Sequence, residues 1–472
     1  MTDPKPAQIT HSQWDEAFKH LPESIKHSYH YLAGTAQQTD YLNDSRCFEE
    51  FEGDTRLRSL KFDNSLASLR LWSFLLSEEG RLHKSRAAGK KIIGTMKDLG
   101  TASILAYACD NAIAFYPDGA WWVPCVMEMS EGLLRVADSL GFGDEMCPAR
   151  AALAAFFKGG HFPMPDLLVG AVGCCCDDFS AIQQRVADTE IPIVWWELPY
   201  RREASPDEPY EVTPTGLKIS TRLVDFVVGQ LGKVKTAIEQ TTGQTITDEK
   251  LKMAISKSNQ MRRLLGKIRD LSYGSAPVPF PSLETQICEM LALHFCSEMD
   301  ESINVLEHVA TTIEARVNNH EGVFPEDSCR CVWVNPVADL RAMNMFESLG
   351  GTIAGTEYLF RHALVQIPTD IDPMRALALA ALCDPMIGSS SYRAQLVVDE
   401  AIRYRAEGVV ISNIPGASHC ATEGTIIRDY VHEKTGLPVL EITIPPLIDS
   451  ESAQLSTRFE AFFETIRARR NK

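Results

Sequence analysis

Three consecutive cysteines are the feature of this sequence best suited to chemistry. Cys174, Cys175 and Cys176 stand in the segment AVGCCCDDFS, directly before Asp177 and Asp178. An isolated cysteine is usually a small buried apolar side chain. Adjacent residues of an extended segment point in opposite directions, so the triplet cannot lie wholly in one apolar core. Thiolates bind metals, and metal ligation is therefore the chemistry that the triplet suggests.

Further cysteines occupy positions that are comparable with the triplet. Cys420 and the triplet each follow an apolar run and precede a helical pattern, while Cys147 and Cys383 each stand beside a proline turn. Cys125 follows a run that ends in a tight turn. In parallel α/β sheets, ligands bind at the turns where strands lead into helices, and helix N-termini there favour a thiolate. We therefore expect these cysteines to converge on one site.

The spacing of the cysteines bears on which metal they hold. Structural zinc sites use C-x₂₋₄-C pairs, which this chain lacks, since one residue separates Cys329 from Cys331. Those two cysteines point the same way on an expected buried strand and are interpreted as core. Widely scattered cysteines favour an iron–sulfur cluster that the tertiary fold assembles. Isolated cysteines elsewhere are interpreted as apolar core; they include Cys47, Cys109, Cys288 and Cys296.

Two other polar residues are candidates for proton transfer. His419 adjoins Cys420, and Glu197 ends an apolar run that contains two tryptophans. Either side chain could donate or accept a proton in catalysis, or could be an ordinary polar group at a turn or strand end. The sequence contains no phosphate-binding G-x-x-x-x-G-K-[ST] loop, no G-x-G-x-x-G and no G-x-S-x-G.

Apolar runs that alternate with amphipathic segments must position these residues. In 91–213, strands are expected at 111–117, 166–172 and 191–199, with helical patterns between them. Such alternation indicates a parallel sheet covered by helices. The same order of strand, cysteine turn, helix and strand returns in 329–472, so the chain is expected to hold two copies of one α/β unit that face each other across a cleft.

The rest of the chain is expected to be helical. Residues 1–90 form an N-terminal helical extension, and 214–328 form a helical segment that a breaker loop at 274–282 interrupts. Within it, Thr247 precedes Asp248 and Glu249, a pattern typical of a helix start. The expected domains are thus 1–90, 91–213, 214–328 and 329–472.

Composition limits the possible environment and partners. The chain has 472 residues, more than a single hydrophobic core usually contains, so several domains are expected. The net charge of −17 argues against a surface that binds nucleic acid. No signal peptide is recognisable, and no uncharged apolar run reaches the roughly 18 residues of a membrane span. We expect a cytoplasmic protein without nucleic-acid or membrane partners, whose 13 cysteines are not a disulfide framework.

Several segments resemble the 2-hydroxyacyl-CoA dehydratase and class I benzoyl-CoA reductase family. The helical segment TGQTITDEKLKMAISKSNQMRRLLGKI, with Asn259 and Arg262, resembles one landmark of the family. CPAR, the Cys-Asp of CCCDD, CRCVWVNPVADLRAMNMFESLGG and GVVISNIPGASHCATEGTIIRDYVHEKTGLPVLEI resemble others. The resemblance covers about 90 to 470 and rests on the order and spacing of these motifs.

The resemblance implies two Rossmann-like domains that hold an iron–sulfur cluster between them. It also implies a homologous partner subunit, or a second copy of this chain, and a separate ATP-hydrolysing activator, which agrees with the missing phosphate loop. A [4Fe-4S] cubane of the dehydratase type would be held by Cys147, Cys176 and Cys420.

This chain has more cysteines near the expected site than a three-cysteine cubane needs. Some members of the family hold a double cubane, [8Fe-9S], on six cysteines. The favoured set here is Cys125, Cys147, Cys175, Cys176, Cys383 and Cys420, with Cys174 ranked lower because it shares the direction of Cys176. Residues 1–90 have no counterpart in the resemblance.

The leading hypothesis is a cluster-bearing subunit of an ATP-dependent, low-potential aryl-CoA (benzoyl-CoA) reductase. Three alternatives stay open. The chain could be a stand-alone double-cubane reductase of small molecules, a 2-hydroxyacyl-CoA dehydratase subunit, or a non-catalytic electron-transfer subunit. The aryl-CoA or acyl-CoA substrate could be bound by this chain or by its partner.

Overall fold

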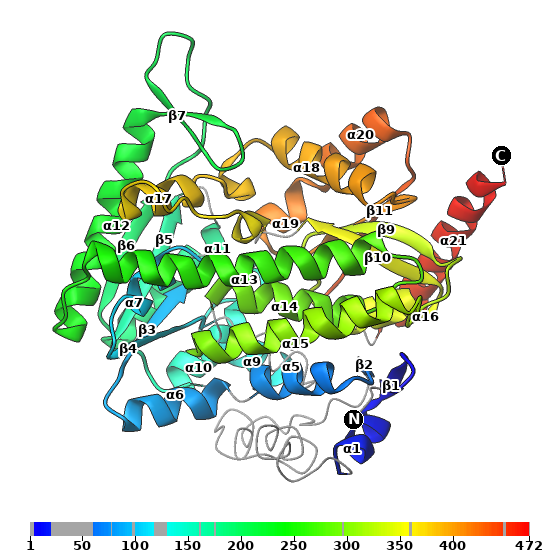
Figure 1. Ribbon diagram of the computed structural model, residues 1–472, viewed down its shortest axis with the longest axis horizontal. Helices are drawn as coiled ribbons and strands as arrows, with labels where there is room; N and C mark the ends of the chain where they lie inside the picture. The colour runs from blue at the N-terminus through cyan, green and yellow to red at the C-terminus, as the bar shows by residue number, and fades with distance from the viewer. Residues whose placement is uncertain are drawn as a thin grey trace.

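The fold is mixed α/β and contains two parallel four-stranded sheets, each associated with helices (Figure 1). It is described here from a computed structural model. The described residues are 4–19, 60–76, 78–96, 100–117, 130–159, 162–173, 176–294, 297–357, 361–446 and 450–471.

The two sheets share one strand order. The first contains β3 (Lys91–Met96), β4 (Ala112–Phe115), β5 (Leu167–Gly173) and β6 (Ile193–Leu198), in the spatial order β4-β3-β5-β6. The second contains β9 (Cys329–Val334), β10 (Gly351–Glu357), β11 (Gly408–Asn413) and β12 (Val439–Thr443), in the order β10-β9-β11-β12. In each sheet the second strand along the chain lies at one edge, beside the first. The two copies expected from the sequence are therefore present as two Rossmann-like sheets.

Helices cover both faces of the second sheet. Successive side chains of a strand point to opposite sides of the sheet, so neighbouring residues of β9 contact different helices. Val332 and Val334 of β9 pack in the apolar cluster of α18 (Ser390–Arg403) and α20 (Gly424–Thr435). Trp333, which lies between them, packs edge-on against Phe346 of α16 (Arg341–Ser348) and near Phe459 of α21 (Ser452–Arg470). Cys329 and Cys331 are fully buried on β9, so the prediction that they belong to the core is confirmed.

The first sheet is associated with shorter helices. α7 (Ala102–Tyr107) packs on β3 and β4, and α11 (Asp177–Val186) packs on β5. α10 (Ala152–Lys158) contacts α11 and α9 (Ser130–Ser139). The strands expected at 111–117, 166–172 and 191–199 are present as β4, β5 and β6. The first strand, β3, was not predicted, although its residues are almost entirely buried.

Four long helices lie between the sheets in sequence. They are α12 (Thr221–Thr242), α13 (Asp248–Gly274), α14 (Ser282–His294) and α15 (Met299–Asn318). The predicted helix start is confirmed, because the Thr247 side chain accepts a hydrogen bond from the backbone N–H of Lys250. α13 contacts α7 of the first unit and β10 of the second, and Figure 1 shows it running across both.

Asn259 and Arg262, the pair noted in the sequence, anchor α13 to both units. The Arg262 guanidinium donates to the backbone oxygens of Gly100 and Val365, each at 2.9 Å. The Asn259 amide exchanges two hydrogen bonds of 2.8 Å with the backbone of Ile367. Both side chains are buried, so these bonds fix the helix in place.

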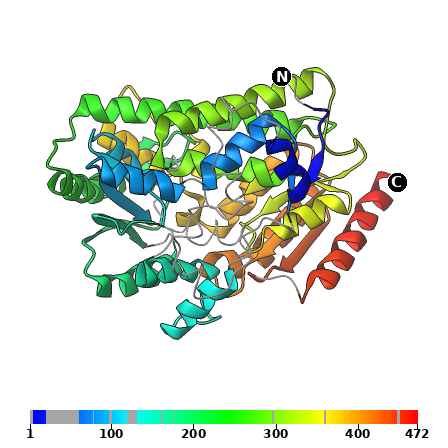
Figure 2. The same cartoon turned by 90° about the horizontal axis from the view of Figure 1, so that it is seen from below.

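The remaining elements are short or peripheral. In the N-terminal region β1 pairs with β2, and α21 lies at the outer end of the molecule (Figure 2). The β1–β2 pair and the β7–β8 hairpin were not predicted. No helix in the described part of the chain is long and apolar enough to cross a membrane. The domain boundaries stay a prediction. The other elements are β1 (Gln8–Thr10), α1 (His11–Lys19), β2 (Lys61–Asp63), α5 (Leu66–Leu76), α6 (Glu78–Ala87), η1 (Pro148–Ala151), η2 (Ala187–Thr189), β7 (Tyr210–Val212), β8 (Lys218–Ser220), η4 (Arg361–Leu364), α17 (Pro373–Ala381), η5 (Pro385–Ile387) and α19 (Ser418–Thr422).

Candidate metal centre

Three cysteines from the two α/β units stand at turns that begin short helices or follow strands. Cys176 follows β5 and is the N-cap residue of α11, and Cys147 is the N-cap residue of η1. Cys420 lies in α19, which follows β11. Their exposed fractions are 9%, 9% and 6%, so all three are buried. β5 and β11 are equivalent strands of the two sheets, which explains why their following turns both carry a cysteine.

The end of β5 requires glycine. Gly173 adopts φ 103°, and a Cβ atom there would stand 2.5 Å from the backbone oxygen of Leu198 on β6. Only glycine adopts such a conformation at low cost, and only glycine leaves room for the neighbouring strand. Glycine therefore allows β5 to end close against β6, three residues before Cys176.

A buried arginine holds the turn that carries Cys147. The Arg150 guanidinium donates to the backbone oxygen of Met146 and to the Asp144 carboxylate, both at 2.9 Å. Arg150 is 2% exposed, so these bonds compensate for the removal of its charge from water. The arginine of the CPAR motif therefore shapes the turn that presents Cys147.

The Asp178 carboxylate shows that the turns of the two units meet. It accepts a hydrogen bond from the backbone N–H of Cys147 at 3.4 Å and another from that of Ser418 at 3.0 Å. Ser418 begins α19 and lies two residues before Cys420. The turns that carry Cys147, Cys176 and Cys420 thus contact one side chain.

The three thiols are also coupled electrostatically. Burial, followed by the nearby Cys176 thiol, raises the pKa of Cys147 well above its usual value, and Cys420 and Asp178 act in the same direction. Negative charges on these groups would therefore repel one another. Binding of a cation is the ordinary means by which proteins keep such clustered thiols ionised.

An arginine supplies positive charge beside Cys420. Arg393 of α18 is buried and donates to Glu357 at 2.7 Å and to Asn335 at 2.9 Å. Burial alone would lower the pKa of Arg393, but the charges of Glu357 and Glu423, with a contribution from Cys420, raise it above its usual value. Asn335 also donates to the backbone oxygen of Cys420 at 3.3 Å. Arg393 therefore stays charged and is connected to the Cys420 turn.

The three thiols fit a cluster better than a single ion. In the described part of the chain, no three His, Cys, Asp or Glu side chains lie close enough together to enclose one metal ion. A cubane does not need that arrangement, because its cysteines bind through different iron atoms. Three buried thiols presented by separate turns match this requirement. An iron–sulfur cluster would be held by Cys147, Cys176 and Cys420.

The structure places the other predicted site residues as follows. Cys125, Cys174 and Cys175 lie outside the described residues. Glu197 is exposed on β6, where it pairs with Val172 near the end of β5. His419 lies in α19 next to Cys420. Their predicted roles stay predictions.

Cys383 follows α17, and its thiol bonds to residues other than Asp178 and the three cysteine turns. Its thiol donates to the backbone oxygen of Leu379 at 3.4 Å and accepts from the Thr215 hydroxyl at 3.5 Å. In the repeated order of strands it corresponds to Cys147, since each precedes the third strand of its sheet. Ligation by Cys383 is a prediction that these local bonds do not address.

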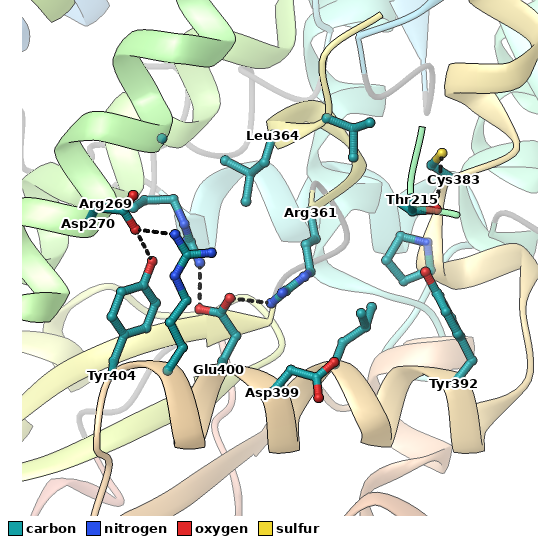
Figure 3. Close-up of a pocket in the computed structure, with 15 residues that line it drawn as sticks. Thr215, Arg269, Asp270, Arg361, Leu364, Cys383, Tyr392, Asp399, Glu400 and Tyr404 are labelled. Atoms are coloured by element: carbon teal, nitrogen blue, oxygen red, sulfur yellow. Dashed lines mark hydrogen bonds and ion pairs between the residues drawn. The ribbon is translucent and has the colours of Figure 1, made fainter. Parts of the chain in front are cut away.

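Cys383 instead lines a cavity of about 440 Å³ (Figure 3). Cys383 and Thr215 lie at one end, and an ion-pair network lies at the other. In that network Glu400 accepts from Arg269 at 2.9 Å and pairs with Arg361 at 2.8 Å. Apolar residues also line the cavity, and they include Leu364, Val365, Pro385 and Leu396. The cavity can therefore take a ligand with both apolar and polar parts.

The cavity and the cysteine site share helix α18. Tyr392 lines the cavity, while the next residue, Arg393, extends toward Cys420. Adjacent residues of one helix thus take part in the two sites, Tyr392 directly and Arg393 through Asn335, which donates to the backbone oxygen of Cys420.

Comparison with known proteins identifies the family. Residues 101–466 match the family described as 2-hydroxyglutaryl-CoA dehydratase, D-component. The chain belongs to this family. The match includes three strands of the first sheet, all of the second sheet and all three clustered cysteines, and the resemblance inferred from the sequence is confirmed.

One curated relative is part of a reductase. A subunit of the benzoyl-CoA reductase of Thauera aromatica is 20% identical over 199 residues, which are 40% of this chain and 50% of that protein. The chain thus matches half the length of this relative. Similarity of this chain therefore extends to a protein that is named for reduction as well as to a family that is named for dehydration.

Sequence reasoning missed several residues that shape the site. Asp178, Ser418, Asn335 and Arg393 were not singled out, because each contacts a segment far away in sequence. For Asp178, a signal existed in the two consecutive acids after the cysteines. Helix geometry turns only one of the two toward the protein interior, but the direction of the interior cannot be read from the pair itself.

Proposed function

We propose that this chain is the cluster-bearing subunit of an ATP-dependent aryl-CoA reductase that works at low potential. The observation that carries the proposal is that the turns of Cys147, Cys176 and Cys420, from two equivalent units, all contact the Asp178 carboxylate. Membership in the D-component family and the similarity to part of a benzoyl-CoA reductase support it.

The residues of the chain would hold the cluster and control its surroundings. A bound iron–sulfur cluster supplies one-electron transfer at a potential that ligation, charge and exposure determine. Burial of the three cysteines keeps water away, and low exposure favours the state of lower net charge. Asp178 places negative charge on one side of the site, and Arg393 places positive charge near Cys420.

The cavity beside α18 is the proposed position of the acyl end of the substrate. Its apolar walls suit an aromatic ring, and Arg361 can stabilise negative charge on a thioester oxygen. Tyr392 lines this cavity and its neighbour Arg393 is connected to the Cys420 turn through Asn335, so α18 links the proposed substrate site to the proposed cluster site. A Leu396→Trp variant fills the cavity. It should raise KM or abolish reduction while the iron content stays at the wild-type level.

A partner must supply the energy of ATP hydrolysis under this proposal. The sequence has no phosphate-binding loop of the P-loop type. Purified chain should therefore lack ATPase activity, and aryl-CoA reduction should require an added ATP-hydrolysing activator with a low-potential reductant. ATPase activity that copurifies with the chain and disappears in a site-directed variant of it would show that this chain hydrolyses ATP itself, which would contradict the proposal.

The name of the family favours a second candidate, a subunit of a 2-hydroxyacyl-CoA dehydratase. The two candidates differ in the fate of the electron, which a reductase consumes and a dehydratase recovers. Reductant consumed per product formed separates them: a stoichiometric requirement supports the reductase, and a catalytic requirement supports the dehydratase.

The decisive first experiment is metal analysis of the chain purified under strict exclusion of oxygen. A double cubane predicts about eight irons and nine sulfides per chain, and a single cubane predicts about four of each. We expect the larger value because of the extra cysteines in this chain. Zinc in place of iron would contradict the proposal.

A further inference from the structure

One buried carboxylate connects all three cysteine turns. Asp178 is 7% exposed and is the second residue of α11. Its Oδ1 accepts from the backbone N–H of Cys147 at 3.4 Å. Its Oδ2 accepts from the backbone N–H and the hydroxyl of Ser418 at 3.0 and 3.1 Å, and from the Cys176 thiol at 3.7 Å.

The two oxygens of Asp178 serve different parts of the chain. Oδ1 bonds the first unit, where Cys147 is 31 positions away, whereas Oδ2 accepts both from the Cys176 thiol and from the second unit, where Ser418 is 240 positions away. Acidic side chains at a helix start usually face the backbone N–H groups of their own helix. Here, among the described residues, the bonds of this carboxylate go instead to the turns that carry the cysteines.

Asp177 provides an internal comparison. It has the same side chain and is the adjacent residue of the same helix start, but it is exposed to solvent. Water screens the charge of Asp177, whereas the charge of Asp178 acts in a buried site where electrostatic interactions are stronger. The same substitution at either position therefore removes one formal negative charge, but only the substitution at Asp178 removes the bonds to the cysteine turns.

We propose that Asp178 is a positioning residue that holds the turns of Cys147, Cys176 and Cys420 in register for a cluster and keeps that cluster difficult to reduce. This inference rests on the proposed function for the cluster and goes beyond it. Fixed negative charge close to a cluster opposes the addition of an electron, because reduction makes the cluster more negative. When Cys176 binds iron its thiol proton leaves, and the three donors from Cys147 and Ser418 remain on the carboxylate.

The positioning role can be tested in the cluster-free full-length chain. Asp178→Ala removes both acceptor oxygens, and Asp178→Asn keeps one and places an amide donor against N–H groups. Hydrogen–deuterium exchange at the amides of Cys147 and Ser418 should then accelerate on the order of tenfold, as expected for loss of one hydrogen bond. Asp177→Asn should leave both amides at the wild-type rate. Unchanged exchange in both Asp178 variants would overturn the positioning role, whether or not the protein binds iron.

The effect on the cluster is measured separately, by anaerobic redox titration followed with electron paramagnetic resonance. Asp178→Asn should shift the midpoint potential to a less negative value and alter the g-values, while Asp177→Asn leaves the spectrum as in the wild type. Equal midpoint potentials in the wild type and both variants would overturn the electrostatic role.

If Asp178→Asn loses its iron, its midpoint potential cannot be measured, and Asp178→Glu then provides the test. Glutamate restores the charge with a longer side chain, so Asp178→Glu should recover iron that Asp178→Asn loses. Iron loss in Asp177→Asn equal to that in Asp178→Asn would show general damage to the helix start and overturn the proposal. Absence of iron from the wild type would refute the proposed function alone, since the exchange experiment still decides the positioning role.

Discussion

Gly416 lies directly against the backbone of Met146, although 270 residues separate them in sequence. Gly416 has φ 74°, and a Cβ atom there would stand 2.6 Å from both the carbonyl carbon and the oxygen of Met146. Met146 precedes Cys147, and Gly416 precedes the helix that contains Cys420. The two α/β units therefore touch backbone to backbone beside the cysteines, a contact that only a glycine permits.

The first prediction concerns this contact. Gly416→Ala should push the Cys420 turn away from the Cys147 turn and lower the iron content after reconstitution. It should also destabilise the protein by about 1–3 kcal/mol, from backbone strain and overpacking. The matched control is Gly436→Ala, since Gly436 has φ 66° at the end of α20 but nothing within 4 Å of its Cβ position. The control should show strain without iron loss, and equal iron contents would contradict the prediction.

The second prediction separates cluster ligands from core cysteines. Serine is a poor iron ligand, so Cys147→Ser, Cys176→Ser and Cys420→Ser should each cause a large loss of iron. Cys288→Ser is the control, because Cys288 is fully buried in α14 and outside the site. It should cost stability but retain iron.

The same series tests the larger ligand set. Loss of about half the iron in Cys125→Ser, Cys175→Ser and Cys383→Ser would support a double cubane, which contains two iron-bearing units. Full iron content in all three would leave the three-cysteine cubane. Loss of iron in Cys331→Ser, which alters a buried residue of β9, would contradict the assignment of that cysteine to the core.

Much of the fold follows from local patterns. Strand β5, LLVGAVG, is a continuous apolar run, β11, GVVISN, contains a shorter one, and the helix start at Thr247 is a local hydrogen bond. The strand β3 escaped detection because its sequence, KIIGTM, has only two adjacent aliphatic residues, whereas GVVISN of β11 has three. Only its central position in the sheet explains why it is nevertheless buried.

The sequence allowed the cysteines to be ranked by their position at turns. It did not show which groups surround each cysteine. Cys147 and Cys383 have similar proline turns and equivalent places in the repeat. The first faces the Asp178 carboxylate and the second bonds Thr215 beside a cavity. The difference arises from contacts with other elements, which spacing along the chain does not contain.

The third prediction concerns the buried cation near Cys420. Arg393→Ala removes the guanidinium that forms ion pairs with Glu357 and Glu423, and removal of one member of a buried ion pair costs about 3–5 kcal/mol. Arg403 lies on the same helix but is exposed in its pair with Asp270, so Arg403→Ala should cost less than about 1 kcal/mol. Urea unfolding of both variants measures the difference. Similar losses would show that Arg393 does not act as a buried charge.

A buried acid provides the fourth prediction. Glu284 of α14 is fully buried, and burial, with the nearby Asp63 charge, raises its pKa to about 8. Its Oε1 accepts from the backbone N–H of Asp63 at 2.8 Å, and its Oε2 has no hydrogen-bond partner among the described residues. Asp63 itself pairs with Arg316 of α15, so the cation of this cluster is already engaged. The structure therefore favours the protonated form of Glu284.

The sign of the resulting pH dependence follows from proton binding. The folded pKa of about 8 lies above the ordinary value of 4.5, so the native state binds more protons than the unfolded state between these pH values. The contribution of Glu284 to stability is complete below the lower value and is lost as the pH rises through about 8. Glu284→Gln mimics the protonated acid. It should therefore gain on the order of 4 kcal/mol over the wild type at pH 8.5, relative to pH 5. Urea midpoints at the two pH values measure this difference, with Glu464→Gln on the exposed face of α21 as the control. If the two variants follow the wild type in parallel, Glu284 does not titrate in this window.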